Sequence, residues 1–186
     1  MSTRALIGVL LAGTVGLVIF FYVQVGSDPN KPIKVGASSA SACSKAEGDC
    51  LPDVSYVAVD GRAYTPKDLL GKVVVVNFWA TWCPPCKKEI PALSSVYRRY
   101  KERGMVLLGV MEDNPKNDEL LNFRSDYDMS YPVIRGSFDV VEAFGSPDRL
   151  PTTFVFNKKG KQVYSHIGPL DEDELARLVE KFLAET

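Results

Sequence analysis

The chain has 186 residues, 46% hydrophobic and 24% charged, which is the composition of a globular domain with an apolar core and room for an appendage. Its formal net charge is −1, so bulk charge gives no reason to expect binding to nucleic acid or anionic lipid. Four cysteines form two close pairs, Cys43 with Cys50 and Cys83 with Cys86. Paired cysteines in a chain with an apolar N-terminal segment favour an oxidising or redox-managed compartment.

The apolar segment lies near the N-terminus. Residues 5–27 contain no charged side chain, and as a helix they would be about 34 Å long, enough to cross a bilayer. We therefore expect residues 1–27 to be a membrane anchor or an uncleaved signal sequence, with a cleaved signal peptide as the alternative. The flanking charges barely decide the orientation of this segment in the membrane, since Arg4 precedes it and Lys31 and Lys34 follow it. The cysteine usage favours a domain on the extracytoplasmic (periplasmic or outer) side.

Residues 28–50 are rich in Ser, Ala, Gly and Pro and show no apolar periodicity, so they are predicted to form a flexible tether. Cys43 and Cys50 lie within this segment. A small-loop disulfide is the simplest interpretation of the pair. Thiols that exchange with the other cysteine pair, or a metal clip, are the alternatives, although the only histidine, His166, is remote in sequence.

Residues 51–186 are predicted to form one domain, which begins with a hairpin and a buried strand. Residues 54–59 and 62–65 flank Asp60-Gly61, a dipeptide typical of tight hairpin turns. Residues 72–79 are nearly all β-branched or aromatic, as in a central strand that is buried on both faces.

Helices and strands then alternate along the chain. A helix opened by prolines is predicted for residues 84–103, with Pro91 inside it as a kink, and a second apolar strand for residues 105–111. A polar helix is expected at residues 116–128, and another helix is expected to begin within residues 140–144.

The C-terminal part completes the order of elements. Two strands, residues 152–156 and 161–166, are joined by a turn, and an amphipathic helix covers residues 171–184. After the hairpin, the order β–α–β–α–β–β–α predicts an α/β fold with a central mixed sheet flanked by helices.

The second cysteine pair lies where the buried strand meets the helix. Cys83 follows the strand and opens the helix, and the partial positive charge of a helix N-terminus stabilises a thiolate. Cys86 lies about one turn later, close enough for a disulfide. This spacing predicts a redox pair in which Cys83 is the nucleophile and Cys86 the resolving thiol. Half of a zinc site and a structural disulfide are weaker alternatives.

Pro84 and Pro85 separate the two cysteines and have no backbone N–H. They fit the first turn of a helix but withhold two amide donors from a thiolate at its start. This absence of donors favours a reducing poise over a strongly oxidising one.

The run of residues 74–91 resembles the membrane-anchored, extracytoplasmic thioredoxin-like reductases of the group around TlpA and ResA, which is linked to cytochrome c maturation. The resemblance extends from about residue 51 to the end of the chain. It implies a thioredoxin fold with an added N-terminal β-hairpin and a helical insertion at residues 112–130. It also implies no cofactor beyond the Cys83–Cys86 disulfide, no metal and a monomer. The implied partners are disulfide-containing or dithiol protein substrates and a membrane electron donor.

The same resemblance implies further site residues. Residues 150–154 look like the loop that carries a cis-proline, here Pro151, against the active disulfide and pairs with substrate. Trp82, Leu150 and Thr152 are accordingly expected to contact substrate. Glu89 matches an acid that this group uses near its active cysteines, with an ordinary solvated helix residue as the alternative.

One position departs from thioredoxin itself, which has a buried aspartate six residues before the first cysteine. Here that residue is Asn77, which cannot accept a proton. Deprotonation of Cys86 then needs another group, and Glu89 is the candidate.

Three other activities are compatible with such a fold. A disulfide-forming oxidant would use the same cysteines. A thiol peroxidase would need a proline within residues 76–83, which is missing. A copper-delivery protein would add a distant histidine to the two cysteines, and only His166 is present.

Overall fold

The structure is a computed structural model that describes residue 43 and residues 49–185. The predicted anchor at residues 1–27 and most of the predicted tether at residues 28–50 lie outside the described residues. Within the described part, no helix is both long and apolar enough to cross a membrane.

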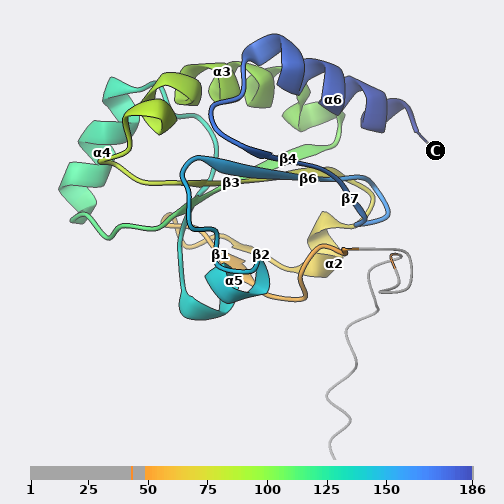
Figure 1. The fold of residues 1–186 in the computed structure, drawn as a ribbon, viewed down its shortest axis with the longest axis horizontal. Coiled ribbons are helices and arrows are strands. Elements are labelled where there is room, and N and C mark those ends of the chain that lie inside the picture. The colour runs from red at the N-terminus through yellow and green to blue at the C-terminus, as the bar shows by residue number, and fades with distance from the viewer. Residues whose placement is uncertain (1–42, 44–48, 186) are drawn as a thin grey trace, which may run out of the picture. The chain divides into compact units, whose positions relative to one another are not determined.

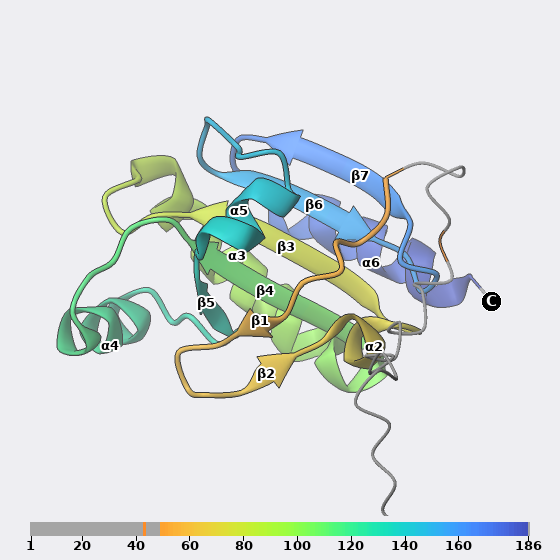
Figure 2. The ribbon, with the colours of Figure 1, turned by 90° about the horizontal axis from the view of Figure 1, so that it is seen from below.

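A five-stranded mixed sheet forms the centre of the described domain, with strand order β5-β4-β3-β6-β7 (Figure 2). Its strands are β3 (Val73–Trp79), β4 (Met105–Met111), β5 (Val133–Arg135), β6 (Thr152–Phe156) and β7 (Gln162–Ile167). β3 pairs parallel to β4 and antiparallel to β6, so it is central, and all of its residues are buried as predicted.

Helices cover both faces of this sheet. α3 (Pro84–Tyr100) and α6 (Glu172–Ala184) lie on one face, whereas α2 (Pro66–Leu69) and α5 (Phe138–Ala143) lie on the other (Figure 1). Side chains alternate along a strand, so β3 contributes to two cores. Trp79 joins the core on the α3 side, and Phe78 joins the opposite one.

The boundaries of α3 follow from its terminal residues. Cys83 is the N-cap, and Pro84 and Pro85 occupy the first positions, where a missing N–H costs nothing. Pro91 lies inside the helix. A short 3₁₀ turn, Lys101–Arg103, follows α3. It ends at Gly104, whose φ of 100° is in the left-handed region that commonly terminates a helix, so the helical segment ends at residue 103 as predicted.

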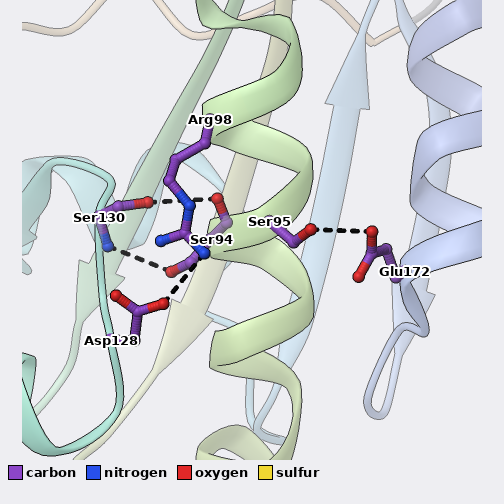
Figure 3. Close-up of polar contacts among 6 residues, drawn as sticks. All are labelled: Ser94, Ser95, Arg98, Asp128, Ser130 and Glu172. Carbon is purple, nitrogen blue, oxygen red and sulfur yellow. Dashed lines mark hydrogen bonds and ion pairs between the residues drawn. The ribbon is translucent and has the colours of Figure 1, made fainter.

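Polar contacts hold α3 on both sides (Figure 3). Ser94 Oγ accepts a hydrogen bond from the Ser130 N–H (3.1 Å), and Ser130 Oγ donates to the Ser94 carbonyl (3.2 Å). On the α6 side, Ser95 Oγ donates to Glu172 Oε1 (2.8 Å). These contacts fix the helix that carries both active cysteines.

The N-terminal hairpin is shorter than predicted. Its strands are only β1 (Tyr56–Val57) and β2 (Ala63–Tyr64), with Gly61 in the left-handed region in the connecting loop. The two residues after β1 pair with the main sheet. The Val59 N–H donates to the Val133 carbonyl, and Ala58 forms a β-bridge with Ile134.

Two other elements were not predicted. The four-residue helix α2 and the three-residue strand β5 are too short to show a periodicity in the sequence. The polar helix, by contrast, is present as α4 (Asn117–Asp126). The order of the main elements is therefore confirmed, with β5 as the strand that the predicted order lacks.

The end of the predicted tether pairs with the domain. Cys50 bridges Lys161, the Leu51 N–H donates to the Gly160 carbonyl, and the Gln162 N–H donates to the Asp49 carbonyl. Residues 49 and 50 are therefore not free chain, which corrects the C-terminal limit of the tether. A disulfide joins Cys43 to Cys50, as the small-loop interpretation predicted.

Candidate active site

The second disulfide joins Cys83 to Cys86 at the junction of β3 and α3. The S–S distance is 2.06 Å, and both residues are buried in the core on the α3 side. The predicted pairing and its place at a strand-to-helix corner are both present.

The environment of Cys83 Sγ follows from its N-cap position. The Cys86 N–H donates to Cys83 Sγ (3.3 Å), as capping side chains do at a helix start. Pro84 and Pro85 contribute no amide, so Cys86 supplies the first N–H of the helix. The next amide, of Lys87, donates instead to the Cys83 carbonyl (3.2 Å).

Glu89 lies in the core beneath this corner, with 2% of its surface exposed. Its Oε1 accepts from Asn77 Nδ2 (2.8 Å), and its Oε2 accepts from the Leu170 N–H (3.0 Å). Burial raises the pKa of Glu89 from 4.5 to about 7, although these two hydrogen bonds oppose the shift. A solvated helix residue, the alternative for Glu89, is therefore excluded.

Asn77 connects Glu89 to the sheet. It is fully buried on β3, and its Nδ2 also donates to Thr153 Oγ1 (3.0 Å) on the neighbouring strand β6. Because an amide cannot accept a proton at neutral pH, Asn77 can orient Glu89 but cannot replace it as a base.

The predicted cis peptide bond is present between Leu150 and Pro151. Thr152 pairs with Phe78 across the sheet, so this loop lies at the end of β3 that leads to Cys83. Leu150 packs against the core that contains both active cysteines. The Pro151 carbonyl is already bonded, since it accepts from the Gly168 N–H (2.8 Å).

Trp82 is 67% exposed, although it directly precedes the buried Cys83. The ring is therefore accessible from solvent, and its contact with substrate stays a prediction. Trp79 and Phe78, which were predicted to be core residues, are fully buried.

Lys87 is half-buried beside two aromatic rings. Its Nζ lies 5.9 Å from the ring centre of Phe123 and 5.8 Å from that of Tyr127, both on the side of α4. Phe123 in turn stacks on Trp79 with ring centres 5.3 Å apart. The helical insertion thereby packs against the helix that carries the cysteines.

A contact between Thr81 and Asp113 was not predicted from the sequence. Thr81 N–H lies 3.2 Å and 3.1 Å from the two carboxylate oxygens of Asp113, and the Thr81 hydroxyl also donates to Asp113 Oδ2. A signal was available, because β3 and β4 are parallel neighbours and residues that follow such strands meet at one edge of the sheet.

No group of three or more His, Cys, Asp or Glu side chains suited to a metal ion occurs among the residues that the structure describes. His166, the residue that a copper site would need, lies on the edge strand β7 and stacks against Tyr164. The thiols of the active pair are bonded to each other.

Comparison with known proteins finds relatives in sequence and in structure. Residues 48–165 match the AhpC/TSA family. The chain is 30% identical over 178 residues to thiol-disulfide oxidoreductase ResA of Bacillus cereus, covering 96% of this chain and 94% of that protein. It is 36% identical over 159 residues to ResA of Bacillus subtilis, with 84% of each protein covered.

A crystal structure of a thiol:disulfide interchange protein of the thioredoxin family, from Chlorobium tepidum TLS, is similar with a TM-score of 0.66 and 31% identity. The match covers 73% of this chain and 96% of that one. The predicted thioredoxin fold and redox chemistry are thus confirmed. The chain belongs to the AhpC/TSA family and, within it, to the ResA-like thiol–disulfide oxidoreductases.

Proposed function

We propose that this oxidoreductase works as a membrane-anchored, extracytoplasmic reductase of protein disulfides. The observation that carries the direction of electron flow is the first turn of α3, where Cys83 Sγ has the Cys86 amide as donor and two prolines in between. Fewer amide donors stabilise the reduced, thiolate form less, and a less stable thiolate makes the dithiol a better reductant.

The exchange has two steps. The Cys83 thiolate attacks one sulfur of the substrate disulfide, forming a mixed disulfide and releasing a substrate thiolate that takes up a proton. The Cys86 thiolate then attacks Cys83 Sγ, which releases the second substrate thiol and leaves the Cys83–Cys86 disulfide. Two electrons pass to the substrate, and an external dithiol must return the pair to its reduced form.

Glu89 is the group we assign to the second step. It lies three residues after Cys86 on the same helix, a spacing that places two side chains on one face. With a pKa of about 7 in the oxidised protein, its carboxylate is available as a proton acceptor for the Cys86 thiol near neutral pH.

Substrate contact is assigned to the surface around the disulfide. Trp82 is exposed beside Cys83, and Leu150 and Thr152 flank Pro151 at the same end of the sheet. The relatives named ResA support a protein disulfide as the substrate, and an apocytochrome c is the proposed example. Residues 1–27 are the proposed anchor, a membrane dithiol protein the proposed electron donor, and a monomer the proposed state.

The direction is tested by the reduction potential of the Cys83–Cys86 couple, measured against glutathione or dithiothreitol buffers. A reductase should equilibrate below roughly −200 mV, whereas a value above about −150 mV would show an oxidant. The Cys86→Ser variant should accumulate mixed disulfides through Cys83, which identifies the substrates by mass spectrometry. Hydroperoxide turnover and copper titration of the reduced protein separate the peroxidase and copper-delivery alternatives.

A further inference from the structure

The short segment between β3 and α3 determines where the nucleophile lies. Residues 80–83 include Thr81, the exposed Trp82 and Cys83, and one backbone hydrogen bond closes the turn, from the Cys83 N–H to the Ala80 carbonyl (3.2 Å). Thr81 is held from outside the segment, because both its N–H and its hydroxyl donate to the Asp113 carboxylate.

Asp113 is itself held in place. It lies just after β4, where the Glu112 N–H continues the strand pairing by donating to the Trp79 carbonyl (2.9 Å). Arg135 on β5 then fixes the following loop: its guanidinium donates to Asn114 Oδ1, to the Pro115 carbonyl (3.3 Å) and to Asn117 Oδ1 (2.8 Å).

We propose that Asp113 is a positioning residue for disulfide exchange, which holds Thr81 so that Cys83 is presented to the substrate disulfide. Hydrogen bonds to an ionised acceptor are stronger than neutral ones. The chain on both sides of Asp113 is held, by strand pairing at Glu112 and by Arg135 at residues 114–117. The proposal rests on the exchange activity of the family and is independent of the direction of electron flow proposed above.

A carboxylate near a redox pair could act through its charge instead, and two substitutions separate the two roles. Asp113→Asn removes the charge but keeps an oxygen that accepts from the Thr81 N–H and an amide that donates to the Thr81 hydroxyl. Asp113→Ala removes both the charge and the hydrogen bonds. Asp118→Asn, on the exposed first turn of α4, is the matched control for the charge change.

The test is the second-order rate constant for oxidation of the reduced full-length protein by oxidised glutathione, followed by tryptophan fluorescence. We expect Asp113→Ala to lower it about tenfold, because a small misplacement of a reacting atom is costly. Asp113→Asn should stay within about threefold of the unmodified chain, and Asp118→Asn should not differ from it.

Thr81→Val keeps the shape and the charge but loses the hydroxyl donor, so it provides a second measurement if Asp113→Ala does not fold. It should lower the rate constant about threefold. An Asp113→Asn rate constant as low as that of Asp113→Ala would show that Asp113 acts through its charge. Unaltered rate constants in folded Asp113→Ala and in Thr81→Val would show that the hydrogen bonds between Thr81 and Asp113 do not affect exchange. Either result overturns the proposal. Unmodified protein that fails to react at all would refute the exchange activity and not the role of Asp113.

Discussion

Glu89 makes the stability of the folded chain depend on pH. Its pKa is about 7 when folded against 4.5 ordinarily, so the folded state binds the proton more tightly than the unfolded state. The protonated side chain therefore stabilises the fold fully below the unfolded pKa, and that contribution is lost as the pH rises through 7. A shift of this size corresponds to about 3 kcal/mol of unfolding free energy between about pH 4 and about pH 8.

Replacing Glu89 with Gln should abolish that dependence. We expect the unfolding free energy of the oxidised Glu89→Gln variant to exceed that of the unmodified chain at about pH 8 but not at about pH 4, because the glutamine is never charged. Urea denaturation at both pH values measures the difference. The exposed Glu142→Gln change on α5 is the control, and equal pH profiles for the unmodified chain and Glu89→Gln would show that Glu89 is not held protonated by burial.

Trp82, unlike the buried Glu89, is exposed, so its ring contributes little to the packing of the core. We expect Trp82→Ala to change the unfolding free energy by less than about 0.5 kcal/mol, the usual limit for surface substitutions. If the ring contacts substrate, kcat/KM for the reduction of insulin should fall about tenfold, as for an interface aromatic, while the reaction with oxidised glutathione changes much less. Phe138→Ala on α5, which removes a ring that is 78% exposed, should leave both reactions unaltered. Equal losses for insulin and for glutathione would instead assign Trp82 to positioning Cys83.

At the scale of an element, the polar contacts of α3 contribute unequally to the free energy of unfolding because they differ in burial. Ser94 is fully buried, so Ser94→Ala leaves the Ser130 N–H without its acceptor and should cost about 1–2 kcal/mol of unfolding free energy. Arg98 pairs with Asp128 at 3.0 Å in solvent, so Arg98→Ala should cost less than about 1 kcal/mol (Figure 3). Urea denaturation of both variants decides the order, and a larger loss for Arg98→Ala would contradict it.

The elements that the sequence predicts well are those whose pattern is local. β3, β4 and α3 are marked by an apolar run, a second apolar run and a proline start, and all three are found close to the predicted limits. β5 has only three residues, and its burial depends on chain segments distant in sequence, so no local pattern reveals it.

The residues of the site likewise fall into those that a local motif reveals and those that only the fold brings together. Cys83 and Cys86 were predicted from spacing and context, and both are where the motif placed them. The position of Glu89 three residues after Cys86 does not decide whether it is buried or solvated. Its burial depends on Asn77 and Leu170, which contact it from distant parts of the chain. Asp113 and Thr81 each follow a strand that the sequence predicts, but they meet only because β3 and β4 are parallel neighbours, and this pairing was not predicted.

At the scale of the whole domain, the two disulfides lie at opposite ends of the sheet. Cys50 bridges Lys161 at the start of β7, beside the end of β6 that pairs with Val74, whereas Cys83 follows the far end of β3. A strand of seven residues spans roughly 20 Å, which is too far for one pair to attack the other in the folded chain. Direct exchange between the pairs, an alternative left open by the sequence, is therefore incompatible with this fold.

The double variant Cys43→Ser, Cys50→Ser should accordingly keep its exchange rate while losing stability. Opening a disulfide loop closed over a sequence separation of 7 should lower the unfolding free energy by about 2 kcal/mol, because the unfolded chain gains freedom. The rate constant with oxidised glutathione should stay within about twofold of the unmodified chain, since Cys83 and Cys86 retain all the contacts described for them. Urea denaturation and stopped-flow fluorescence measure the two quantities on the same preparation. A rate that falls in parallel with stability would mean that the first disulfide takes part in exchange, and it would require the two ends of the sheet to communicate through an opened form of the domain.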